Sequence, residues 1–231
     1  MAGALVDLLH RPVYGMAQVD RLLGLHAGTA RRWIDGYSTR ARTYVPVVRR
    51  RSTGVEVITW GEFVETRLLA ELRFAGVPLL NLRPAVDRLR DEYGDYPLAK
   101  AQPFAVGREV VRSVQDAVGL DASLQLVVVR NGQLMLSPPA RHFYESIDYS
   151  DNGDAQRVRP LNGETSVVID PLRGFGEPVV RNVRTEVIAE LRRAGESVRS
   201  ISDTYELSID QVDAALRYEL VRMQAGEDEA A

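Results

Sequence analysis

The sequence predicts an α+β protein with a winged helix-turn-helix at its N-terminus, a β-rich middle segment and a C-terminal domain of three helices. Three observations favour this fold class. Residues 16–37 hold two short amphipathic segments around a glycine turn, which is the helix-turn-helix pattern. Two strand-like runs follow directly, and residues 184–223 contain three further segments with apolar residues at helical spacing.

The second helix of the predicted helix-turn-helix carries the first candidate binding residues. Ala30, Trp33 and Ile34 share one face, which leaves Thr29, Arg31 and Arg32 on the outside. Hydroxyl and guanidinium groups suit DNA phosphates and the acceptor edge of guanine. We expect this helix to enter a DNA groove; the alternative is an ordinary solvated helical hairpin.

Residues 43–49 and 55–60 are rich in β-branched and aromatic side chains and predict the two strands of a wing, joined by a loop at residues 50–54. Arginines on such a loop would meet the phosphate backbone, although charges at a strand edge can also serve only to block pairing. The predicted DNA contacts outside the second helix are Tyr37, Arg40, Arg42, Arg49, Arg50 and Arg51.

Helices predicted at residues 61–75 and 82–93 complete a first domain, residues 1–97. Residues 98–162 form the β-rich connector, a candidate dimerisation segment with a hairpin at Asn131-Gly132, strand-like residues at 104–111, a short helix at 138–146 and a polar loop at 148–156. Residues 163–231 begin with short strands at 167–169 and 179–180. Helices at 184–194, 198–205 and 209–223 follow, the last capped by Ser208.

Composition excludes several classes of function. The chain has 231 residues, 45% hydrophobic and 26% charged, and no cysteine, so disulfides, thiol catalysis and cysteine-bound zinc are excluded. We expect a cytoplasmic protein, since neither a membrane span nor a signal peptide stands out. The net charge is −3, yet residues 29–55 hold seven arginines and one acid, and the tail is acidic. Such asymmetry indicates different partners at the two ends.

No constellation of residues predicts catalysis. His10, His26 and His142 are scattered along the sequence, and phosphate-binding, dinucleotide and nucleophile-elbow motifs do not occur. We therefore expect no enzyme activity, no cofactor and no metal site.

The N-terminal region resembles the MerR-like helix-turn-helix. The resemblance lies in the Gly28-Thr29-Ala30-Arg31-Arg32-Trp33 segment, in Arg42-Thr43-Tyr44 and in the helix start Trp60-Gly61-Glu62-Phe63. It implies that Thr29, Arg31 and Arg32 face DNA. The long dimerisation helix and effector domain of MerR regulators do not occur here, so metal or drug sensing is not implied.

The C-terminal region resembles a small antitoxin-associated domain family of formerly unknown function. The residues that match its pattern are Ile169, Asp170, Pro171, Pro178, Arg184, Thr185, Gly195, Asp203, Tyr205, Leu207, Val212, Ala215, Leu216 and Tyr218. Together the two halves resemble VapB-type antitoxins of type II toxin–antitoxin pairs. This resemblance implies a VapC-type PIN-domain ribonuclease as partner and repression of the pair's own operator DNA.

Two arginines near the C-terminus, Arg217 and Arg222, are candidates to pair with the carboxylates of such a nuclease. If the N-terminal domain reads an inverted repeat, a homodimer is expected. Two other hypotheses stay open at this point: a stand-alone transcriptional repressor without a toxin, and an assembly module whose helical hairpins only pack.

Overall fold

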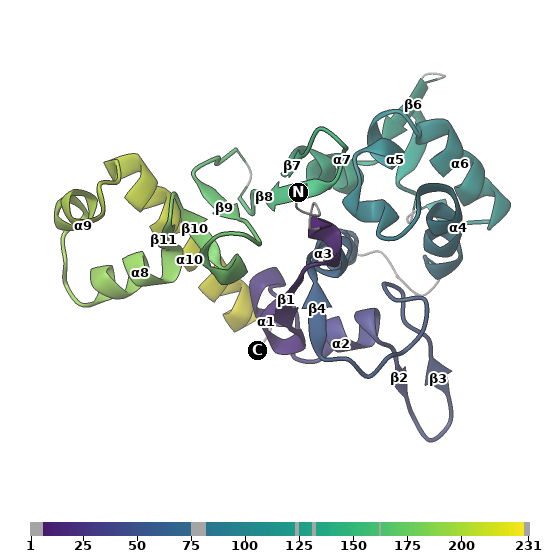
Figure 1. Ribbon diagram of the computed structural model, residues 1–231, viewed down its shortest axis with the longest axis horizontal. Helices are drawn as coiled ribbons and strands as arrows, with labels where there is room; N and C mark the ends of the chain where they lie inside the picture. The colour runs from purple at the N-terminus through teal and green to yellow at the C-terminus, as the bar shows by residue number, and fades with distance from the viewer. Residues whose placement is uncertain (1–6, 75–81, 123–124, 131–132, 162, 229–231) are drawn as a thin grey trace, which may run out of the picture. The chain divides into compact units, whose positions relative to one another are not determined.

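The computed structural model of the chain describes residues 7–74, 82–122, 125–130, 133–161 and 163–228 (Figure 1). The chain forms two compact units, one of residues 1–145 and 149–155 and the other of residues 146–148 and 156–231. Helices and antiparallel sheets occur in the chain, which confirms the predicted α+β class.

The N-terminal part of the first unit contains the helix-turn-helix and short antiparallel strand pairs. Strand β1 pairs with β4, and β2 pairs with β3. The elements in chain order are η1 (Leu8–His10), β1 (Pro12–Gly15), α1 (Met16–Leu23), α2 (Thr29–Ile34), β2 (Tyr37–Ser38), β3 (Thr43–Tyr44), β4 (Val57–Thr59), α3 (Trp60–Phe74) and α4 (Arg83–Tyr93).

Helix α3 is the centre of this unit. It contacts α1, α2, β1, β4 and, further along the chain, α7. Its first turn carries Trp60 and Phe63, both fully buried, and the Tyr14 ring from β1 lies 4.6 Å from the Phe63 ring. Trp60 also donates a 2.7 Å hydrogen bond from Nε1 to the carbonyl of Ala155. The helix-turn-helix therefore stands on a rigid apolar base.

The predicted wing is wrong in its pairing. Residues 43–49 and 55–60 do not form a hairpin; β3 pairs with β2, and β4 pairs with β1. After β3 the chain is irregular because its amides bind the end of α2: those of Val47 and Val48 donate to the carbonyl of Trp33 at 2.8 and 3.0 Å. The valines at 47 and 48 therefore have the composition of a strand, but their amides cap the end of α2.

The middle segment is more helical than predicted. The strand-like residues 104–111 lie in helices of residues 102–105 and 108–117 and in the turn between them. Phe104 and Val111 are buried, whereas Val106 and Val110 are exposed, so the packing of the first two side chains outweighs the local β propensity. On α6, buried Gln115 donates to the carbonyl of Val127 and accepts from the amides of Leu126 and Val127, which fixes the helix to β5. The elements are η3 (Pro97–Ala99), α5 (Gln102–Ala105), α6 (Arg108–Ala117), β5 (Val127–Arg130), β6 (Gln133–Leu136) and α7 (Pro138–Glu145).

Two predictions in this segment have definite outcomes. The hairpin at residues 126–136 is confirmed by the pairing of β5 with β6; its turn, Asn131-Gly132, lies outside the described residues. The short helix predicted at residues 138–146 is confirmed as α7.

The second unit is a five-stranded antiparallel sheet with three helices (Figure 1). The sheet order is β11-β10-β9-β8-β7, and the boundary between the two units falls within the β7–β8 hairpin. The predicted strands and the three predicted helices are confirmed. The elements are β7 (Ile147–Tyr149), β8 (Ala155–Val158), β9 (Val167–Ile169), η5 (Gly174–Gly176), β10 (Pro178–Val180), β11 (Val183–Arg184), α8 (Thr185–Arg193), α9 (Val198–Tyr205) and α10 (Ile209–Asp228).

The core of the second unit lies between the sheet and its helices. Its members come from β9, β10, all three helices and the turn between α9 and α10: Val167, Val180, Ile188, Ile201, Leu207, Val212, Ala214, Ala215 and Tyr218. Ser208 caps α10 as predicted, accepting from the amide of Gln211 at 3.1 Å, and the Gln211 side chain accepts from the amide of Ser208. This reciprocal pair is a capping box.

Candidate nucleic-acid interface

The turn of the helix-turn-helix is fixed by one buried carboxylate. Helix α1 ends at Gly24 in the left-handed conformation. Asp20, on the last turn of α1, is 5% exposed and accepts 2.7 Å hydrogen bonds from the amides of Gly28 and Ala30. These amides belong to the N-terminus of α2, which lacks a side-chain cap of its own. The first helix therefore caps the second and sets its direction.

Helix α2 presents the predicted polar face. Ala30 and Ile34 are fully buried, while Arg31 and Arg32 are exposed. Arg32 donates from Nη2 to the hydroxyl of Thr29 at 3.0 Å, and Arg31 forms an ion pair with Glu56. Both guanidinium groups stay at the surface, where phosphates and base edges could reach them.

The hairpin β2–β3 extends from the end of α2 (Figure 1) and holds three more predicted contacts. The rings of Tyr37 and Tyr44 stack at 4.5 Å, and the Arg42 guanidinium lies over Tyr44, 5.2 Å from the ring centre. At the turn, Thr39 donates to the carbonyl of Arg42 through its amide and its hydroxyl. Arg40 lies exposed at this turn. The hairpin is thus a stiff projection with arginines at its tip.

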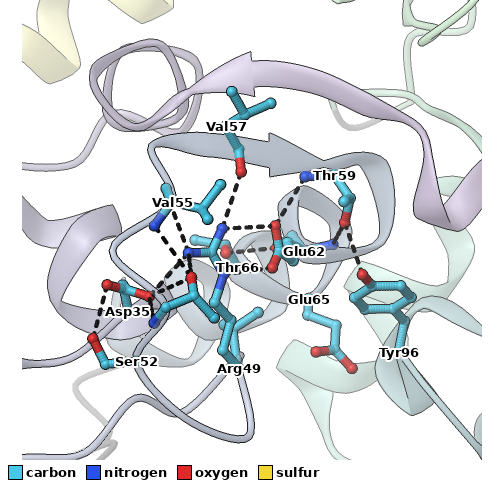
Figure 2. Close-up of polar contacts among 12 residues, drawn as sticks. Asp35, Arg49, Ser52, Val55, Val57, Thr59, Glu62, Glu65, Thr66 and Tyr96 are labelled. Carbon is cyan, nitrogen blue, oxygen red and sulfur yellow. Dashed lines mark hydrogen bonds and ion pairs between the residues drawn. The ribbon is translucent and has the colours of Figure 1, made fainter.

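Arg49 is a correction to the predicted DNA contacts, because its guanidinium is used inside the protein. Figure 2 shows it between Asp35 and Glu62. Nε donates to Oε1 of Glu62 at 2.7 Å and Nη1 to Oδ1 of Asp35 at 2.9 Å. The remaining donors bind Thr53 and the carbonyls of Val55 and Val57. With 9% of its side chain exposed, Arg49 joins α2 to α3 and cannot also bind a phosphate.

Asp35 follows α2 and anchors the loop that returns to β4. It accepts from the amides of Thr53 and Gly54 at 2.7 and 2.9 Å and from the hydroxyl of Ser52 at 3.0 Å. Burial by itself raises the pKa of Asp35, but the bonds from Thr53, Arg49 and Gly54 outweigh it and hold the pKa well below the ordinary value. The charged form of Asp35 therefore organises the loop beside α2.

The two remaining wing arginines stay at the surface. Arg50 lies 3.7 Å from Asp91 in an exposed ion pair, and Arg51 is exposed. The loop backbone is held from behind by α4: Arg83 donates to the carbonyls of Pro46 and Arg50, and Arg90 to those of Val47 and Val48. Of the three consecutive arginines, two are available for DNA.

Comparison with known proteins finds a family match for the helix-turn-helix region. Residues 12–86 match the family described as "Putative DNA-binding HTH domain". Two relatives come from Mycobacterium tuberculosis (strain ATCC 25618 / H37Rv). "Uncharacterized protein Rv2308" is 35% identical over 96% of this chain and 98% of its own length. "Putative antitoxin VapB45" is 30% identical over 89% of this chain and 92% of its own length. The chain belongs to the family of these two proteins.

In this chain the matched helix-turn-helix domain precedes the sheet-and-helix unit. Residues 167–218 of the second unit match "Protein of unknown function (DUF433)". The X-ray crystal structure of Rv2018 from Mycobacterium tuberculosis is similar, with a TM-score of 0.73 and 28% identity over 89% of this chain and 97% of that one. The similarity covers most of both chains.

The two C-terminal candidates differ in their surroundings. Arg222 is half-buried and donates from Nε and Nη2 to Oε2 of Glu219 at 2.9 and 2.6 Å. The other oxygen of Glu219 accepts from the buried hydroxyl of Thr185. Arg217 lies 3.6 Å from Glu164 and is 65% exposed. Of the two side chains, Arg217 is the more exposed, at 65% against 22% for Arg222.

Sequence reasoning missed Asp20, Asp35 and Glu62, the carboxylates that hold α2 in place. An aspartate before a glycine turn is a weak signal for a cap, since the same residue is common on any helix surface. Within the described ranges, no group of three histidine, aspartate or glutamate side chains is placed to bind a metal. None of the described helices is both long and apolar enough to cross a membrane.

Proposed function

We propose that this protein is the antitoxin of a toxin–antitoxin pair, which represses its own operon and neutralises a PIN-domain ribonuclease of the VapC type. The observation that carries the DNA-binding half is the exposed cationic surface on α2 and the β2–β3 hairpin. It contains Thr29, Arg31, Arg32, Tyr37, Arg40 and Arg42, with Arg50 and Arg51 on the adjoining loop.

The geometry of this surface supports operator binding. Helix α2 is only six residues long and is held at both ends, by Asp20 and by the Asp35–Arg49 pair. A short fixed helix and a stiff hairpin present cations in one arrangement, so little conformational entropy is lost when DNA binds. Two copies on an inverted repeat would form the expected homodimer–operator complex.

The antitoxin half is supported by the relative that bears the name "Putative antitoxin VapB45", which matches this chain over both units. A nuclease that works with a divalent metal carries carboxylates around it, so exposed arginines on the antitoxin would complement its active site. The alternative is a stand-alone dimeric repressor with the same DNA surface and no toxin.

The DNA-binding half is tested by titrating the promoter DNA of the operon with the full chain at several salt concentrations. Log affinity should fall linearly with log salt, and Arg32→Ala and Arg42→Ala should each weaken binding about 10-fold. Arg199→Ala on α9 is the matched control, because Arg199 is also exposed and lies on the other unit. Equal effects of all three variants would contradict this interface.

The antitoxin half is tested by co-expression with the neighbouring ribonuclease gene. A stable complex in which ribonuclease activity is silent supports the antitoxin. Elution of this chain alone, with the promoter DNA still bound, supports the alternative repressor.

A further inference from the structure

The loop between β9 and β10 presents two large apolar side chains to solvent. Phe175 is 91% exposed, the highest value among the large hydrophobic side chains of the described residues, and Leu172 is 63% exposed. They lie three residues apart in one loop, whereas isolated exposed apolar residues are common on any surface. Pairs of this kind at one tip indicate an interaction site.

This loop is rigid. The buried carboxylate of Asp170 accepts from the amide of Leu172 at 2.8 Å, and its carbonyl accepts from the amide of Arg173 at 3.0 Å. The loop closes on itself through bonds from Gly176 to Arg173 and from Glu177 to Gly174. At its base, Pro178 pairs with Ile169 across the β9–β10 ladder. Leu172 and Phe175 are therefore held in place before any partner arrives.

The backbone at Phe175 is strained. Its φ is 58°, and its neighbours Gly174 and Gly176 have φ of 54° and 78°. The left-handed conformation is unfavourable for a residue with a side chain, and such strain persists at functional sites. Gly174 is required, because a Cβ there would lie 2.6 Å from Cγ1 of Val179. This strained backbone exposes the Phe175 ring to water, so the ring contributes little packing to the isolated unit.

Two arginines lie in or beside the loop that carries the two apolar side chains. Arg173 is half exposed and lies 3.5 Å from Asp170, and the side chain of Arg184 lies beside Gly174. Glu177, at the end of the loop, is half-buried. An aromatic anchor bordered by cations fits an apolar pocket with carboxylates at its edge.

We propose that Phe175 and Leu172 anchor the toxin, by entering an apolar pocket bordered by carboxylates on the PIN-domain ribonuclease. This inference rests on the antitoxin function proposed above. It assigns the main toxin contact to the β9–β10 loop instead of Arg222. Pre-organisation of the loop lowers the entropy cost of binding, which suits a complex that must silence an enzyme.

The test measures the affinity of the full-length chain for the purified ribonuclease encoded by the adjacent gene. Phe175→Asn is the main variant, because asparagine tolerates the left-handed conformation and removes the aromatic ring. We expect binding to weaken at least 10-fold, with a smaller loss for Leu172→Ala. Phe74→Ala is the matched control, since Phe74 is 62% exposed on α3, and it should change affinity less than twofold.

Promoter DNA binding and light scattering complete the experiment. Phe175→Asn should leave DNA affinity and oligomeric state unchanged. An unchanged melting temperature of the full chain shows that the second unit, which carries Phe175, is folded. Unchanged ribonuclease affinity in Phe175→Asn overturns the anchor while the antitoxin function stands. A change of oligomeric state with full ribonuclease affinity overturns it in favour of self-association. If the unaltered chain does not bind the ribonuclease at all, the antitoxin function itself fails.

Discussion

The amide of Ala30 donates a 2.7 Å hydrogen bond to Oδ1 of Asp20, ten residues earlier in the chain. The second oxygen of Asp20 accepts from Gly28 at the same distance. One carboxylate thus neutralises the N-terminus of α2, where unpaired amides carry partial positive charge. The position of α2 therefore depends on a buried residue of the preceding helix.

Replacing Asp20 by alanine should destabilise the first unit by about 2 kcal/mol, the upper range for a helix cap, because two amides lose their acceptor. Asp20→Asn should cost less, since an amide oxygen still accepts one bond. Trp33 and Trp60, the two tryptophans of the chain, both lie in this unit, so their fluorescence during urea unfolding measures the loss. An unchanged midpoint in Asp20→Ala would show that the cap is dispensable.

Arg49 and Arg51 should behave in opposite ways despite their proximity. Arg49→Met leaves Asp35 and Glu62 buried without a cation, which should cost about 3–5 kcal/mol. Arg51→Met changes an exposed side chain and should cost about 0.5 kcal/mol or less. Urea unfolding followed by tryptophan fluorescence measures the free energy of unfolding of both variants.

The same two variants distinguish an effect on stability from an effect on DNA binding. Arg51→Met should reduce the salt slope of promoter binding by about 1 if Arg51 meets a phosphate. A stable Arg49→Met protein with a reduced slope would instead assign the phosphate contact to Arg49.

Glu65 makes the stability of the first unit depend on pH. Complete burial raises its pKa from 4.5 to about 7, although Arg90 and the amide of Leu98 act in the opposite direction. Between these two pH values the folded protein holds a proton that the unfolded chain releases. The free energy of unfolding should therefore fall as pH rises from 4.5 through 7, by about 3 kcal/mol in total, and level off at higher pH.

The variant Glu65→Gln should remove this pH dependence, because glutamine does not titrate. Urea unfolding at pH 5 and pH 8, followed by tryptophan fluorescence, gives the difference for each protein. Glu92→Gln is a suitable control, since Glu92 is exposed on α4, and it should behave like the unaltered chain. The same pH difference in all three proteins would exclude Glu65 as its source.

Arg222 should matter for stability and Arg217 should not. Arg222→Met removes two bonds to Glu219, a residue that is 5% exposed and bound to Thr185. We expect a loss of about 1–3 kcal/mol in the second unit. Arg217→Ala breaks only an exposed pair, so its effect should stay below about 1 kcal/mol. Calorimetry on the full chain measures both, and equal melting temperatures would contradict the internal role of Arg222.

The sequence was informative where apolar residues repeat at helical spacing. Helix α3 and the three C-terminal helices were predicted within a few residues, because each buries a continuous stripe against its unit. The helix-turn-helix was predicted for the same reason; of its predicted outward residues, Arg31 and Arg32 are exposed and Thr29 is half-buried.

The pairing of the short strands β1 to β4 could not be predicted from the same signals. Strand β2 has two residues, Tyr37 and Ser38, which is too short for any periodic pattern. Strand β4 pairs with β1, which lies more than 40 residues earlier in the chain. Local residue propensities carry no information about such a long-range pairing. The sequence does not distinguish Arg49 from Arg50 and Arg51. In the structure, Arg49 differs because the carboxylates of Asp35 and Glu62 bind its guanidinium.

The division between the residues that hold α2 and those that it displays has an evolutionary consequence. Asp20, Asp35, Arg49 and Glu62 fix the helix from inside, while Thr29, Arg32 and Arg40 take no part in that support. Duplicated copies of such a gene could therefore exchange the displayed side chains freely and diverge toward different operators without refolding. Several pairs could then coexist in one genome without cross-regulation, and across relatives the four supporting positions should vary together or not at all.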